Sequence, residues 1–361
     1  MPARGVRERA LAFLKRNRRA VVILASLTGV LIFCLLLAAA FGAVSIPPLD
    51  IAKMTLNKIG LTNFSATWPA TDETILFQIR LPRIIAAALV GAALSSAGVL
   101  FQGLLRNPMA DPYIIGTSAG AAFGAVLAMM LPVSFVFFGF GLIPIAAFFG
   151  ALAAVLLVYN LARVGGKTPV ISMLLAGFAV SAMLAAAMSF LITMSDTLQL
   201  KLHSVFSFLM GGVWVSDWKQ IAVIAPVIIG GIAIARFFAF RLNAFALGEE
   251  GAAYLGVDVE RVKLSILALG SLLTGAAVSL SGLVGFVGLV VPHAVRLVLG
   301  PDHRLLLPAA ALSGGAFLVL ADLLARTVLA PSEVPVGIIT ALVGAPFFIY
   351  LIRRTRREYA F

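Results

Sequence analysis

Side chains that could bind or react are rare in this sequence, and its longest polar stretch is residues 246–263, ALGEEGAAYLGVDVERVK. This stretch places Glu249, Glu250 and other charged groups among small residues, in a chain that is 61% hydrophobic and 12% charged. The three histidines are scattered without the spacing of metal ligands, and the single cysteine, Cys34, lies in an apolar run. We therefore predict no metal site, no resident cofactor and no internal disulfide.

A phosphate-binding loop is the other chemistry that the residue types suggest, and its spacing excludes it. Gly166-Lys167-Thr168 resembles the end of such a loop, but the motif needs another glycine five residues before Gly166, and the chain has Leu161 there. The segments on either side of Gly166-Lys167-Thr168 are apolar and predict helices, whereas a phosphate-binding loop follows a β-strand. We expect neither ATP binding nor a catalytic residue in this chain.

Membrane helices must position these polar residues. Soluble domains carry about 25% charged residues, whereas apolar runs long enough to cross a bilayer recur along this chain. The first run, 20–44, is too long for a secretory signal and lacks a convincing cleavage site, so we expect it to be retained. The predicted fold is all-α, a polytopic membrane protein with a single domain over residues 1–361.

Apolar length and breaker residues predict about ten transmembrane helices. They are expected at 21–44, 83–105, 114–131, 141–162, 170–193, 220–240, 262–282, 284–299, 305–328 and 336–352. The eighth is short and starts with a glycine-rich breaker run, so we expect it to enter the bilayer only partly or at a steep tilt.

The net charge of +12 reflects membrane topology and not a nucleic-acid partner. Basic residues gather before the first span and after the last, as the positive-inside rule expects of cytoplasmic ends. The tails at 1–19 and 353–361 are therefore predicted to be cytoplasmic, which agrees with an even number of spans. Alternation then places residues 241–262 in the cytoplasm as well.

Two pairs of segments suggest an inverted internal repeat. GAALSSAG at 91–98 resembles GAAVSLSG at 275–282, and SAGAAFGAVLA at 118–128 resembles LSGGAFLVLA at 312–321. The helices of the first pair are predicted to run in opposite directions, which is a common build of transporters. Helices rich in small residues also resemble one another by chance.

The charges inside the spans bear on the energy source of a transporter. Asp322 is the clear intramembrane acid, and it lies four residues before Arg326, a spacing more typical of a local ion pair than of a proton relay. With neither an ATP site nor a good proton path, the chain is expected to take its energy from another protein. A secondary transporter driven by an ion gradient is the alternative function.

Residues 246–263 fit a coupling element for such an external motor. Small side chains, such as those of Gly248 and Ala253, permit close docking against a groove. Gly256 separates two expected short helices, near 246–255 and 258–264, and Val257-Asp258 would supply the turn and the N-cap of the second one. An amphipathic connector on the membrane surface is the structural alternative.

Several long motifs resemble one family. They are QIRLPR at 78–83, GVLFQGLLRNPMADPYIIGTSAGAAFG at 98–124, MGGVWVSDW at 210–218, ALGEEGAAYLGVD at 246–258, GFVGLVVPHAVRLVLGPDHRLLLP at 285–308 and ADLLARTVLAPSEVPVGIITALVGAPFFIYLI at 321–352. In this order, over residues 20–352, the chain resembles the permease subunits of the ABC importers for cobalamin, ferric siderophores and haem, the FecCD-like, large-substrate (type II) importers.

The resemblance implies an assembly. Two copies of a ten-helix permease would pair around a central pathway, two separate ATP-binding subunits would carry ATP and Mg²⁺, and an extracytoplasmic substrate-binding protein would deliver the cargo. The importer would lie in the cell membrane of a prokaryote. A bulky metal chelate is the implied cargo, with a ferric siderophore first, then cobalamin or haem.

The resemblance also assigns roles to residues. The loop at 241–262 would contact the ATPase through Gly248, Glu249, Glu250, Ala253, Leu255 and Gly256. Arg80, Arg83 and Arg326 would meet glutamates of the binding protein, with snorkelling at the interface as the alternative. The fifth helix would line the pathway through Ser172, Met173, Ser181, Met188, Ser189 and Thr193, with helix packing as the alternative for each.

Overall fold

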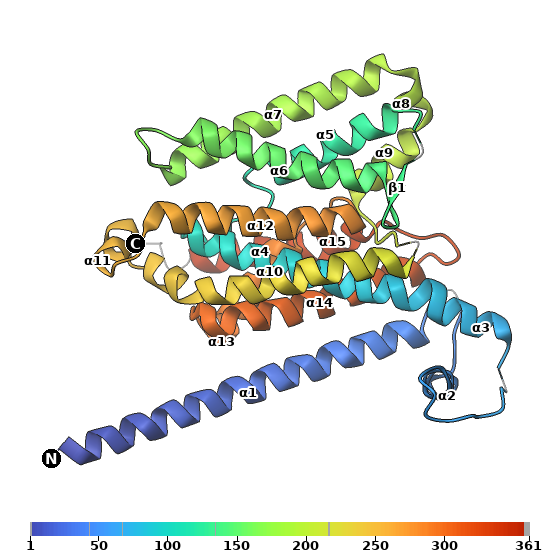
Figure 1. The fold of residues 1–361 in the computed structure, drawn as a ribbon, viewed down its shortest axis with the longest axis horizontal. Helices are drawn as coiled ribbons and strands as arrows, with labels where there is room; N and C mark the ends of the chain where they lie inside the picture. Colours follow the sequence, from blue (N-terminus) through green and yellow to red (C-terminus); the bar gives the residue numbers. More distant parts are fainter. Residues whose placement is uncertain (1, 43, 67, 134, 216, 357–361) are drawn as a thin grey trace.

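The structure, a computed structural model, describes residues 2–356 apart from 43, 67, 134 and 216 (Figure 1). The chain starts with α1 (Pro2–Ala40), α2 (Pro48–Lys58), α3 (Ala70–Thr74), the π-helical segment η1 (Ile75–Arg80), α4 (Leu81–Leu104) and α5 (Thr117–Met130). An antiparallel hairpin of β1 (Val136–Phe137) and β2 (Phe140–Gly141) precedes α6 (Leu142–Ala162), α7 (Val170–Met194), α8 (Asp196–Leu200) and α9 (Leu202–Met210). The remaining elements are α10 (Trp218–Phe245), α11 (Glu249–Tyr254), α12 (Val259–Ser281), α13 (Val287–Leu299), α14 (His303–Thr327) and α15 (Val336–Arg356).

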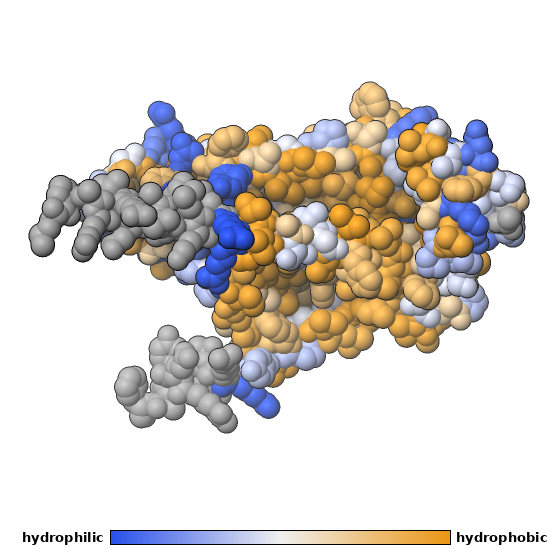
Figure 2. Space-filling view, turned by 90° about the horizontal axis from the view of Figure 1, so that it is seen from below, coloured by the Kyte–Doolittle hydropathy of each residue, from blue (hydrophilic) through white to orange (hydrophobic). Residues whose placement is uncertain are grey.

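The predicted spans coincide with these helices. In the described part of the chain, seven helical stretches are long and apolar enough to cross a membrane, and three shorter apolar helices, Thr117–Met130, Val287–Leu299 and Val336–Leu351, account for the other predicted spans. The predicted N-terminal tail is helical from Pro2 and continuous with the first span, while residues 357–361 lie outside the described residues. Figure 2 shows the apolar surface between more hydrophilic ends that a lipid-embedded bundle requires.

Aspartate caps begin three of the long helices. Asp217, Asp258 and Asp302 each accept a hydrogen bond from a backbone N–H in the first turn of α10, α12 and α14. These bonds satisfy donors that have no partner within the helix. The ends of the spans are therefore set by local sequence and not by apolar length alone.

The core lies where α4 packs between α12 and α14. Glycine allows these backbones to approach: a Cβ added at Gly91 would lie 2.1 Å from the carbonyl oxygen of Gly314. Gly120 and Gly124 play the same part between α5 and α6, where an added Cβ would lie 2.3 Å from the carbonyl oxygens of Gly150 and Ala146. Small residues thus pack helices in lipid, where no hydrophobic force drives their association.

Of the two pairs of segments that suggest an inverted repeat, only one lies on helices that run in opposite directions. The first pair lies on α4 and α12, which run in opposite directions, because α4 begins at the end of the molecule where α12 finishes. The second pair lies on α5 and α14, which both run away from the α11 end of the molecule. In addition, α13 separates α12 from α14, whereas no helix separates α4 from α5. The two sequence matches therefore fit an inverted repeat only in the first pair.

Candidate functional site

The polar stretch at 246–263 forms a bend between α10 and α12 at one end of the molecule (Figure 1). Gly248 and Gly256 have φ angles of 93° and 80°, which glycine adopts without steric cost, so they bound α11 on either side. Asp258 caps α12 by accepting from a backbone N–H at 3.2 Å, as predicted. The expectation of a separate helix at 258–264 is wrong, because no breaker follows the cap and these residues are the first turns of α12.

An exposed surface lies on this bend. Tyr254 is 91% exposed, Leu247 69% and Leu255 59%, with exposed Glu250 and Ala253 beside them. We call these five residues the α11 knob. Large apolar side chains that protrude together from a polar end are typical of a surface that a protein partner covers.

Lys263 is buried below the α11 knob. Its ammonium donates to the carboxylate of Glu249 at 2.7 Å, to that of Glu260 at 3.1 Å and to the backbone carbonyl of Thr168 at 3.0 Å. Glu260 also accepts from the hydroxyl of Thr168 at 2.6 Å and from its backbone N–H at 3.1 Å. Three partners match the three protons of the ammonium. We call these four residues the Lys263 cluster.

The Lys263 cluster joins three segments of the chain. Glu249 belongs to α11, Lys263 and Glu260 begin α12, and Thr168 ends the loop that leads through Pro169 into α7. Removing one partner of a buried ion pair costs about 3–5 kcal/mol, because the other charge is left uncompensated. The cluster therefore resists separation of α11 from the base of α7.

Four of the six predicted coupling residues are exposed in this arrangement. They are Glu250, Ala253, Leu255 and Gly256. Gly248 instead shapes the bend, and Glu249 faces Lys263 with a side chain that is 35% exposed.

Arginines gather at the opposite end of the bundle. Asp322 is 1% exposed and bridges two of them: its carboxylate accepts from Nε of Arg83 on α4 and from Nε of Arg326 on its own helix, each at 2.9 Å. Arg83 also donates through Nη1 to Glu333 at 2.8 Å. Asp322 is thus part of an ion-pair network, as the spacing to Arg326 suggests.

Arg80 bonds backbone carbonyl oxygens, whereas Arg83 and Arg326 bond the carboxylate of Asp322. Arg80 is 5% exposed and donates to the carbonyl oxygens of Ala39, at 2.6 Å, Ala40, at 3.5 Å, and Val44, which lie at and just beyond the end of α1. A cation at a helix C-terminus stabilises the unpaired carbonyl groups there. Arg326 is likewise buried, at 7% exposed. Arg83, with a side chain 17% exposed, is the most accessible of the three.

Helix α7 leaves most of its surface uncovered. Only Met173, Gly177 and Val180 are buried along it. Ser189 and Thr193 lie on the exposed side, where their hydroxyls donate to carbonyl oxygens one turn earlier. Met173 is fully buried, and Ser172, Ser181 and Met188 are half-buried. Of the six predicted pathway residues, only Ser189 and Thr193 therefore lie on the open face.

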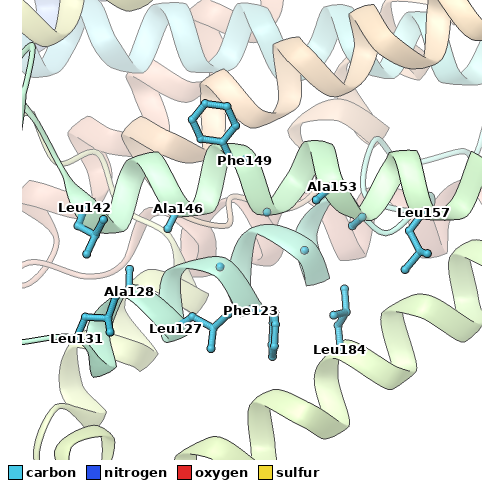
Figure 3. Close-up of a pocket in the computed structure, with 14 residues that line it drawn as sticks. Phe123, Leu127, Ala128, Leu131, Leu142, Ala146, Phe149, Ala153, Leu157 and Leu184 are labelled. Atoms are coloured by element: carbon cyan, nitrogen blue, oxygen red, sulfur yellow. The ribbon is translucent and has the colours of Figure 1, made fainter.

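A groove of about 510 Å³ lies between α5, α6 and α7 (Figure 3). Its lining is apolar throughout, with Phe123, Leu127, Phe149 and Leu184 among the larger side chains. Such a groove has no group that could orient a polar ligand. Among the described residues, no group of three or more histidine, cysteine, aspartate or glutamate side chains could hold a metal ion.

Comparison with known proteins decides the family. The model of the FecCD transport family matches residues 30–354. The chain belongs to the FecCD transport family. This FecCD chain is 50% identical over 285 residues to the cobalamin import system permease protein BtuC of Halobacterium salinarum, which covers 79% of this chain and 75% of that one. It is 40% identical over 332 residues to the hemin transport system permease protein HmuU of Yersinia pestis, which covers 90% and 94%.

A solved structure supports the same fold and family. A structure described as an inward-facing conformation of a metal-chelate type ABC transporter matches the FecCD chain with a TM-score of 0.77 and 30% identity, over 92% of this chain and 99% of that chain. The predicted all-helical ABC importer permease fold is therefore confirmed. The FecCD chain is a membrane-embedded permease subunit and not an enzyme, since ATP hydrolysis belongs to a separate subunit.

Sequence reasoning missed several residues of these sites. Tyr254 and Leu247 are the largest exposed groups of the α11 knob, and an aromatic residue inside a polar insert was a signal for the first of them. Glu333 lies seven residues after Arg326, with no local pattern that links it to Arg83. Thr168 is nearly a hundred residues from Lys263, and no local pattern connects them.

Proposed function

We propose that this FecCD chain imports a bulky metal chelate as one of two identical permease subunits, driven by two ATP-binding subunits at the α11 end. The exposed α11 knob above the buried Lys263 cluster carries this proposal. The knob offers apolar and acidic groups to a partner, and the cluster connects it to α7. ATP and Mg²⁺ reside on the partner, in keeping with the absence of a phosphate-binding loop from the sequence.

The α11 end is the cytoplasmic end in this proposal. Both ends of the described chain are on that side, because α1 begins there and α15 ends there (Figure 1). Arg106, Arg163, Lys167, Arg236, Arg241 and Arg304 are on the same side, in agreement with the positive-inside rule. The protein then lies in the inner or plasma membrane of a prokaryote, and α11 points at the cytoplasmic ATPase.

The opposite end faces the substrate-binding protein. Arg83 is the docking residue that we favour, because part of its guanidinium reaches the surface and arginine suits planar pairing with carboxylates. Arg80 and Arg326 support it from below: the first holds the end of α1, and the second shares Asp322 with Arg83. All three arginines of the expected set therefore act at this end, with Arg83 in contact and the other two as its support.

The open face of α7 meets the second copy across the pathway. Ser189 and Thr193 on that face have hydroxyls that are already bonded within the helix, so they offer a surface of low polarity and no strong ligands. A bulky cargo would pass such a surface without being trapped. Ser172, Ser181 and Met188 border this face, and Met173 anchors α7 to the rest of the bundle.

The cargo class follows from the relatives. The relative with 50% identity is a cobalamin permease and the one with 40% identity is a hemin permease, so cobalamin is the first cargo to test, followed by ferric siderophores and haem. The test is uptake into vesicles that contain this chain, its ATP-binding subunit and its binding protein. We expect ATP-dependent accumulation of one chelate. Accumulation by this chain alone on a proton or sodium gradient would instead show a secondary transporter.

A further inference from the structure

Helix α1 leans away from the bundle toward the α11 end (Figure 1). Its other end is packed: Cys34, Ala38 and Ala39 are at most 3% exposed. Toward the α11 end, Val21 and Val22 are 66% and 57% exposed, and a Cβ added at Gly29 would meet nothing within 4 Å. The helix therefore separates from its neighbours over about half a bilayer thickness.

The space behind α1 is a wedge of about 800 Å³ between α1, α10 and the start of α14. Each helix lines it with one arginine and with apolar residues. These are Arg19 with Ile23 and Leu24 on α1, Arg236 with Ile232 on α10, and Arg304 with Leu305 on α14. We call this space the α1 wedge.

The arginines and the apolar residues lie at different depths in the α1 wedge. Helices α1 and α14 leave the α11 end and α10 arrives there, so Arg19, Arg236 and Arg304 all lie at that end and the apolar residues lie deeper in the bundle. Ten residues of helix, from Arg19 to Gly29, span about 15 Å, which is close to half of a hydrocarbon core about 30 Å thick. The wedge has the depth of one leaflet.

The charges at the mouth of the wedge are predominantly positive. Asp302 is the acid there, and its carboxylate accepts from the side-chain amide of Asn243 at 2.8 Å and from the backbone N–H of Arg304 at 3.1 Å. The guanidinium of Arg304 lies 5.5 Å from the ring centroid of Phe240. Three guanidinium groups against one carboxylate leave a net positive mouth.

We propose that the α1 wedge binds one anionic phospholipid of the cytoplasmic leaflet. Its phosphate lies among Arg19, Arg236 and Arg304, and its acyl chains lie along Ile23, Leu24 and Ile232. A bilayer leaves no such space empty, because an unfilled lining loses its dispersion contacts. Arginines at the cytoplasmic mouth then select a negative headgroup over a zwitterionic one. The inference needs only the membrane location of this FecCD chain and the orientation given by its charges.

The test places a tryptophan in the wedge with the substitution Ile232→Trp and measures its quenching by brominated lipids in detergent-solubilised full-length protein. The native tryptophans lie toward the other end of the bundle, and the parent protein supplies their background. We expect dibrominated phosphatidylglycerol to quench this tryptophan at lower concentration than dibrominated phosphatidylcholine. Each of Arg19→Gln, Arg236→Gln and Arg304→Gln should reduce that preference about fivefold.

The matched control removes three exposed cationic side chains from the same end but outside the wedge, with Arg163→Gln, Lys167→Gln and Arg353→Gln combined. It should keep the preference for phosphatidylglycerol, and 10 mM inorganic phosphate should not displace the lipid. Equal quenching by both lipids would overturn the proposed selectivity. An absence of quenching would show that protein fills the wedge, and displacement by phosphate would show a site for soluble anions; either result would overturn the proposal.

Discussion

Arg83 on α4 and Asp322 on α14 are joined by an ion pair of 2.9 Å although 239 residues separate them in the sequence. The same carboxylate holds Arg326 at 2.9 Å, so one aspartate supports two arginines at the end of the bundle opposite to α11. The pair fixes the ends of two core helices, and it also sets which face of Arg83 is free for a partner.

Asp322→Asn should be strongly destabilising. The substitution leaves the side chains of Arg83 and Arg326, 17% and 8% exposed, without a carboxylate between them. We expect a loss of about 3 kcal/mol in the free energy of unfolding, measured by thermal unfolding in detergent. The control Asp217→Asn changes an exposed pair with Lys219 and keeps a good helix cap, so it should cost less than about 1 kcal/mol. Equal losses in the two variants would refute the bridging role.

Glu333→Gln should strengthen docking of the binding protein. Glu333 has a side chain 53% exposed and occupies Nη1 of Arg83, so it competes with any incoming carboxylate for that group. We expect the dissociation constant in nanodiscs at moderate salt to fall a few-fold for Glu333→Gln and to rise at least tenfold for Arg83→Glu. Docking that is indifferent to both changes would remove Arg83 from the contact surface.

Arg80→Met should loosen the end of α1 without a direct effect on docking. The guanidinium bonds three carbonyl oxygens there, and hydrogen bonds to a charged group contribute about 1.5–3 kcal/mol. Hydrogen exchange of residues 38–50 should become faster, while Arg80→Lys should have an intermediate effect because a lysine makes fewer of these bonds. If exchange is unchanged but docking is lost, Arg80 contacts the binding protein itself.

Apolar length predicted the helices of this protein well. The spans follow from the requirement that backbone groups in lipid be bonded within their own segment, and the caps at Asp217, Asp258 and Asp302 then fix where helices start. The second helix expected at 258–264 failed because nothing in that stretch stops a helix, so α12 continues from its cap into the membrane.

The candidate sites were predictable only in part. Gly256 marked the break after α11, because glycine is suited to positive φ angles, whereas Gly248 was expected inside the first short helix and instead precedes it. The inward turn of Glu249 depends on Lys263 and Thr168, which arrive from other segments. The burial of Arg80 likewise depends on the end of α1, about forty residues away. Side-chain orientation of this kind is set by tertiary contacts, which composition and spacing do not specify.

Tyr254→Ala should weaken binding of the ATP-binding subunit without destabilising the permease. The side chain is 91% exposed, so it contributes little to folding, while truncation of an aromatic anchor at an interface typically costs about 2 kcal/mol or more. We expect at least a tenfold rise in the dissociation constant, measured with purified subunits. The control Phe237→Ala removes another aromatic side chain, 77% exposed on α10, and should leave binding unchanged. Similar affinities for both variants would place the contact outside the α11 knob.

Glu249→Gln and Glu250→Gln should have different effects despite their adjacent positions. Glu249 bonds the buried ammonium of Lys263 at 2.7 Å, whereas Glu250 is exposed on the α11 knob. The first variant should lower the melting temperature and impair coupling, and the second should weaken only the association with the ATP-binding subunit. Identical phenotypes would show that the Lys263 cluster does not distinguish the two carboxylates.

The amount of cargo imported per ATP hydrolysed in Lys263→Met vesicles tests most directly whether motion passes from α11 through Lys263 to α7. Arg261→Met is the control, because Arg261 has a side chain 89% exposed and pairs only locally with Asp258; the quantities of folded, ATPase-bound complex are matched in all vesicles. We predict that Lys263→Met still binds the ATP-binding subunit and supports ATP hydrolysis but imports at least tenfold less cargo per ATP, with partial recovery in Lys263→Arg and a normal ratio in Arg261→Met. A normal ratio in Lys263→Met would contradict the account.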